Sequence, residues 1–66
     1  MSNLKVKGVQ DENGVKNFII TNKDSGEAHI ALREGQFKFR VGEFVGTLKQ
    51  CKELVANDAV VYFADA

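Results

Sequence analysis

The chain is 66 residues long, and nine Lys and Arg residues balance nine Asp and Glu residues, so its formal net charge is zero. A hydrophobic content of 44% and a charged content of 27% are those of an ordinary globular protein and exclude a disordered chain. A single Cys and a single His exclude a disulfide framework and a tetrahedral zinc site, so a core this small must rely on efficient packing or on oligomerisation.

The first part of the chain is predicted to form antiparallel strands, because apolar and polar residues alternate in short runs. The predicted strands cover residues 4–9, 15–22, 27–33 and 36–41. The segments between them contain Asn, Asp, Ser and Gly, which favour tight turns. Loops this short favour a meander in which each strand pairs with the next.

The hydrophobic period changes at Val41 and predicts an amphipathic helix over residues 41–55. Apolar residues then recur three or four positions apart, at Val41, Phe44, Val45, Leu48, Cys51, Leu54 and Val55. Gly42 and Gly46 each weaken a helix by about 1 kcal/mol relative to Ala, and we interpret them as points of close approach to the sheet. Asn57 is a suitable residue at which to end the helix.

A fifth strand is predicted at residues 59–64, which are rich in β-branched and aromatic residues and too few for a helix. Both the odd-numbered and the even-numbered positions of this segment are apolar, which indicates burial on both sides of the strand or at a subunit contact. The candidates for a subunit contact are Val60 and Tyr62. The predicted fold is therefore α+β: a four-stranded antiparallel meander, one amphipathic helix on one face and a short C-terminal strand. It forms one domain over residues 1–66.

The alternation also sorts the basic residues onto one side of the predicted sheet. The side that the helix is expected to cover carries Leu4, Val6, Phe18, Ile20, Ala28, Ile30, Leu32, Phe37, Phe39 and Val41. The other side then holds five cations and one anion, Glu27. The candidate binding residues on this side are Lys5, Lys7, Ile19, His29, Arg33, Lys38 and Arg40.

Three interpretations of this basic side remain open. Lys and Arg on a wetted sheet can serve solubility and block edge pairing alone. A protein partner, or a second copy of the chain, would use the mixture of cations and apolar residues. Nucleic acid would be bound through phosphate contacts to the cations, which are Lys5, Lys7, Arg33, Lys38 and Arg40.

Zero net charge and the expected burial of Phe18, Phe37 and Phe39 favour a protein partner over nucleic acid, because bases stack on exposed aromatic rings. We therefore expect a small accessory protein that acts through protein–protein interaction, by docking on a larger partner or by self-association. The small size favours a homodimer. A nucleic-acid-associated factor is the alternative.

Neither catalysis nor a cofactor nor a metal is expected. His29 is the only imidazole and has no Ser or Cys nucleophile beside it in the predicted sheet. Cys51 lies on the apolar side of the helix, where a thiol is unreactive. The lone cysteine and the lack of a long apolar segment favour a cytoplasmic protein without membrane contact.

The order of four strands and a following helix loosely resembles that of the strand-rich single-stranded-DNA-binding coactivator domains. The resemblance covers about residues 15–55 and lies in the element order, and the predicted strand at residues 59–64 departs from it. It implies no role for any individual residue.

Overall fold

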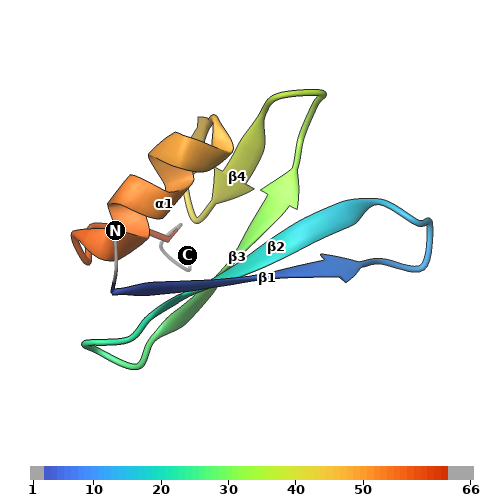
Figure 1. Cartoon of the computed structure of the whole chain (residues 1–66). Coiled ribbons are helices and arrows are strands. Elements are labelled where there is room, and N and C mark those ends of the chain that lie inside the picture. The colour runs from blue at the N-terminus through green and yellow to red at the C-terminus, as the bar shows by residue number, and fades with distance from the viewer. Residues whose placement is uncertain (1–2, 63–66) are drawn as a thin grey trace.

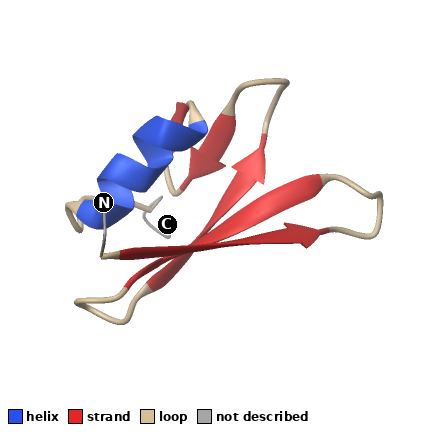
Figure 2. Ribbon diagram, in the orientation of Figure 1, coloured by secondary structure: helices blue, strands red, loops and turns tan. Residues whose placement is uncertain are grey.

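The protein forms a five-stranded antiparallel sheet with one helix across part of one side (Figures 1 and 2). This computed structural model describes residues 3–62. The elements are β1 (Leu4–Gln10), β2 (Lys16–Asn22), β3 (Ala28–Arg33), β4 (Phe39–Val41), β5 (Phe44–Gly46) and α1 (Leu48–Ala56). The strands lie in chain order from β1 to β5, so the predicted α+β class and the meander are confirmed.

The core lies between α1 and the sheet. Its buried residues are Ile20, Ala31, Phe39, Val41, Cys51 and Val55. Asn22 is buried as well, and its amide is satisfied, since Nδ2 donates to the carbonyl of Val55 at 2.9 Å and Oδ1 accepts from the N–H of Asp24 at 2.8 Å. This side chain therefore joins the end of β2 both to the helix and to the β2–β3 turn.

The strand register places β3 with the opposite alternation to the predicted one. Phe18 pairs with Ala31 and Ile20 with His29, so that Ala31 is fully buried while Ile30 is 44% exposed. The prediction that Ala28, Ile30 and Leu32 face the core is wrong. Leu and Ile are more hydrophobic than Ala, so hydrophobicity alone assigns Ile30 and Leu32 to the core. The smaller Ala31 is nevertheless the side chain that packs there.

The predicted helix start at Val41 is wrong, because residues 41–46 form the β4–β5 hairpin instead. Gly42 turns the chain with a φ of 59°, a left-handed conformation that a helix interior does not contain. Thr47 then caps α1: its hydroxyl accepts from the N–H of Gln50, whose side chain accepts in return from the N–H of Thr47. The apolar positions 41, 44 and 45 follow a helical spacing by coincidence.

The chain after the helix is not a strand in its described part. The helix ends at Asn57 as predicted, although Asp58 is the residue in the left-handed conformation, with a φ of 54°. Residues 59–62 are irregular and run past the β4–β5 turn, where the N–H of Glu43 donates to the carbonyl of Val61 at 2.7 Å. The predicted strand at residues 59–64 is therefore wrong over 59–62, and its last two residues, 63 and 64, lie outside the described residues.

Phe37 also departs from its predicted place in the core. It lies in the β3–β4 loop and is 74% exposed. The fourth strand begins at Phe39, two residues after Phe37, so the alternation expected for residues 36–41 does not extend into the loop.

In the described part of the chain, the one helix is too short to cross a lipid bilayer.

Candidate binding face

The side of the sheet that points away from α1 is exposed and combines cations with apolar residues. We call it the open face, and its residues are Lys5, Lys7, Ile19, Ile30, Leu32, Arg40 and Val45. The register joins six of them into two rows: Lys7 pairs with Ile19 and Ile19 with Ile30, while Leu32 pairs with Arg40 and Arg40 with Val45. Paired side chains on neighbouring strands point to the same side of a sheet, so each row forms a continuous strip.

Four of the seven predicted binding residues lie on the open face, namely Lys5, Lys7, Ile19 and Arg40. His29 and Arg33 lie on the other side, because His29 pairs with the buried Ile20 and Arg33 pairs with the buried Phe39. Lys38 is exposed in the β3–β4 loop and belongs to no strand. The prediction that all seven residues share one side is therefore wrong. The inverted alternation of β3 displaces His29 and Arg33, and the later start of β4 at Phe39 leaves Lys38 in the loop.

The positive charge of the open face is smaller than the sequence indicates. Arg40 Nε lies 3.0 Å from a carboxylate oxygen of Glu34, and both side chains are about two-fifths exposed. An ion pair this accessible adds little to stability, but it offsets the charge of Arg40 locally. Lys5 and Lys7 on β1 are left as the cations of this face without a carboxylate partner among the described residues.

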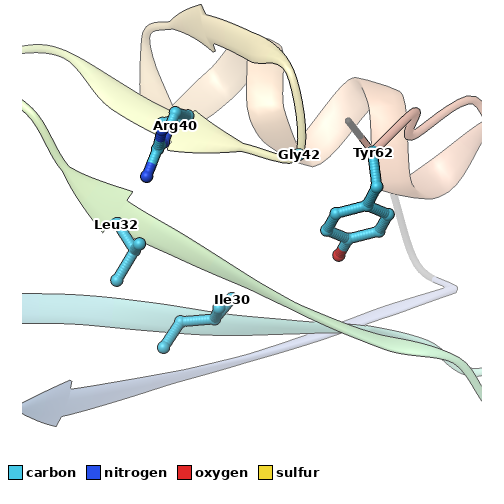
Figure 3. A pocket seen from close by; sticks show the side chains of 5 residues that line it. All are labelled: Ile30, Leu32, Arg40, Gly42 and Tyr62. Atoms are coloured by element: carbon cyan, nitrogen blue, oxygen red, sulfur yellow. The ribbon is translucent and has the colours of Figure 1, made fainter. Parts of the chain in front are cut away.

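A hollow of about 180 Å³ opens on this face where β3 and β4 diverge, and it is lined by Ile30, Leu32, Arg40, Gly42 and Tyr62. Figure 3 shows Ile30 and Leu32 extending from β3 to the same side, with Tyr62 reaching toward β3 from the C-terminal segment. The hollow forms because only Leu32 and Arg33 of β3 pair with β4 in the described chain.

Tyr62 is held in the wall of this hollow by His29. Its hydroxyl lies 2.7 Å from His29 Nδ1, and the two rings stack with centroids 5.7 Å apart. His29 Nε2 lies 3.6 Å from the Glu27 carboxylate, so the imidazole bridges a hydroxyl and a carboxylate. These contacts fasten the C-terminal segment to β3, which is the role of His29 that the geometry supports.

The two residues predicted for a subunit contact lie in different surroundings. Val60 is half-buried and packs against the core of its own chain. Tyr62 is 54% exposed and reachable from the open face. The structure thus brings Tyr62 together with Ile30 and Arg40, while Val60 takes part in closing the core.

Sequence reasoning missed the apolar members of the open face, which are Ile30, Leu32 and Val45. Val45 is 48% exposed on β5, a strand that was predicted as helix. The signals that were available are Gly42 and the Thr47-Leu-Lys-Gln50 capping sequence, because together they indicate a turn and a later helix start.

Comparisons of the chain with protein-family models, with curated proteins and with solved structures gave no significant match. Among the described residues, no three His, Cys, Asp or Glu side chains are grouped so that they could hold a metal ion.

Proposed function

We propose that this chain is a small non-enzymatic binding protein that docks on a protein partner through the open face. The observation that carries the proposal is the exposure of Ile30 and Val45, 44% and 48%, beside the hollow between β3 and β4. Apolar side chains around a shallow concavity are the usual centre of a protein interface, with polar and charged residues at its rim. Lys5 and Lys7 on the edge strand β1 supply such a rim.

The charge of the open face favours a partner that carries carboxylates. The strand residues of this face include three cations and no Asp or Glu. Two copies that met face to face would place cations against cations, and like charges at an interface oppose association. A partner with an apolar centre and acidic groups opposite Lys5 and Lys7 complements the face. A homodimer through the open face is the competing assembly.

Nucleic acid is the weaker alternative on this face. A backbone-tracking site needs several unpaired cations in reach of successive phosphates. Arg40 is paired with Glu34, and Arg33 lies on the other side of the sheet. That leaves Lys5 and Lys7, which are too few to hold a strand by charge alone.

The proposal is tested by affinity capture from cells that express the chain naturally, with quantitative mass spectrometry. The test variants are Ile30→Asp and Val45→Asp, which place a carboxylate in the apolar centre. The matched control is Val6→Asp, because Val6 is 39% exposed but pairs with the buried Ile20 on the opposite side of the sheet. Circular dichroism establishes that each variant is folded.

We expect a defined partner to be retained by the control and reduced at least tenfold by both test variants. Double substitution of Lys5 and Lys7 by Glu should weaken the same complex and remove much of its salt dependence. The proposal fails if no protein shows this pattern. It also fails if purified chain dimerises in sedimentation experiments and Val45→Asp makes it monomeric. It fails as well if oligo(dT) binds and the double substitution of Lys5 and Lys7 by Glu abolishes that binding.

A further inference from the structure

A second apolar surface lies on the side of the sheet that carries α1, beyond the first turn of the helix. It is a groove of about 530 Å³, which we call the aromatic groove, and its main lining residues are Phe18, Arg33, Phe37, Phe39, Thr47 and Leu48. Its volume falls within the range of about 300 to 1,000 Å³ that is typical of ligand sites. It shares none of its residues with the open face, so it is independent of the function proposed above.

Phe37 is the feature of this groove that folding does not explain. It is 74% exposed, the highest value among the large apolar side chains of the described chain. Burying a Phe side chain stabilises a protein by roughly 1.5 to 3 kcal/mol, and this residue forgoes most of that gain. An exposed aromatic ring at the lip of an apolar groove is the arrangement that anchors a binding partner.

The floor of the groove is built on packed aromatic rings. Phe18 and Phe39 meet edge to face, with ring centroids 5.6 Å apart and an interplanar angle of 62°. Phe39 is buried and belongs to the core, so the floor cannot shift without disturbing the fold. A ligand therefore meets a preformed surface and loses little affinity to its reorganisation.

Arg33 supplies one oriented positive charge beside this floor. Its guanidinium lies over the Phe39 ring at 4.9 Å, and its NH1 group donates to the carbonyl of Gln36 at 2.9 Å. A guanidinium has five N–H donors, and in the described chain only those on NH1 have protein acceptors. The remaining donors can bind a carboxylate on two oxygens at once.

We propose that the aromatic groove binds an extended segment of a partner protein, one that inserts an aromatic or large aliphatic side chain beside Phe37 and places an Asp or Glu carboxylate on Arg33. Four apolar side chains and one cation line this groove, so apolar contact dominates and a single anion is neutralised. Single-stranded nucleic acid would need a line of cations for its phosphates as well as rings for its bases.

The test is selection of displayed random 12-residue peptides on the immobilised chain, with counter-selection on Phe37→Ala. Phe37 is mostly exposed, so this variant should keep the fold, as thermal unfolding will verify. We expect the enriched peptides to carry Trp, Phe or Leu within about three residues of Asp or Glu. In fluorescence polarisation, Phe37→Ala should weaken their binding at least tenfold.

A double-mutant cycle isolates the carboxylate contact. Arg33→Gln and the Asp→Asn or Glu→Gln form of the peptide should each weaken binding about tenfold, and their combination should weaken it little further. Arg33→Lys should restore part of the affinity through its charge. Val45→Asp on the open face is the control, and it should leave peptide binding unchanged.

Several results would overturn the proposal. The first is that the selection enriches no peptide. The second is that the enriched peptides bind Phe37→Ala as tightly as they bind the natural chain. The third is that their consensus sequence contains no Asp or Glu. Binding of oligo(dT) that depends on Phe37 would assign the groove to nucleic acid. Dimerisation of the chain that Phe37→Ala abolishes would assign the groove to a second copy.

Discussion

Gly42 offers the most direct test of how the C-terminal segment is held against the sheet. It turns the chain between β4 and β5 with a φ of 59°, and it lies against residues 60 and 61. A Cβ atom at this position would overlap the Val61 carbonyl oxygen and stand 3.2 Å from Val60 Cγ1. Replacement by Ala therefore strains the backbone and displaces the segment as well.

The cost of Gly42→Ala follows from three contributions. A left-handed conformation costs a non-glycine residue about 1 to 2 kcal/mol. Moving Val61 breaks its hydrogen bond from Glu43, which contributes about 0.5 to 1.5 kcal/mol. Loosening the half-buried Val60 removes about 1 kcal/mol of apolar burial. We expect the free energy of unfolding to fall by about 3 kcal/mol.

Gly14→Ala is the matched control. Gly14 has a φ of 79°, and a Cβ there would meet nothing within 4 Å, so only the backbone strain of about 1 to 2 kcal/mol applies. Urea unfolding followed by circular dichroism measures both variants. The urea titrations contain an osmolyte that stabilises folded proteins, so that the unfolding curve keeps a folded baseline. This is needed because the free energy of unfolding of a domain this small is only a few kcal/mol. Equal destabilisation of the two variants would refute the contact between Gly42 and the C-terminal segment.

Two further predictions concern the core. Asn22→Ala should lower the free energy of unfolding by about 2 to 3 kcal/mol, because it removes the hydrogen bond to Val55 and leaves N–H groups of the β2–β3 turn without an acceptor. Urea unfolding measures this loss, and a value below about 0.5 kcal/mol would contradict the prediction. Cys51 is fully buried, and burial raises the pKa of its thiol. At pH 8 a disulfide reagent should therefore label the native chain at least about a hundredfold more slowly than the urea-unfolded chain. Equal labelling rates would place the thiol at the surface.

The strands were largely predictable from the sequence because their alternation and their turn residues agree. β1, β2 and β3 begin and end within a residue of the predicted bounds. Which side of β3 faces the helix was not predictable, since Ile30 and Leu32 on one side outweigh Ala31 on the other by hydrophobicity alone. Packing decides it: Ala31 belongs to the buried cluster between α1 and the sheet, and which side chain fits there is a property of the assembled layers.

The β4–β5 hairpin shows a different limit of sequence reasoning. Val41, Phe44 and Val45 satisfy a helical spacing, yet a two-residue turn places Val41 opposite Phe44 on neighbouring strands. The same residues therefore fit both periods, and only local signals distinguish them. Gly42 and the capping box at Thr47 were those signals, and they indicate the structure that forms.

The inverted alternation of β3 changes the functional argument more than the fold. It moves Arg33 from the open face to the aromatic groove, where one oriented cation adjoins Phe37, and it moves Ile30 and Leu32 onto the open face. A basic sheet surface that resembled a phosphate-binding site thus becomes two smaller surfaces, each with an apolar centre and few cations. Phosphate tracking needs many cations on one surface, while protein recognition needs apolar anchors with few oriented charges. This redistribution therefore supports the two proposals made above, of a protein partner on each side of the sheet.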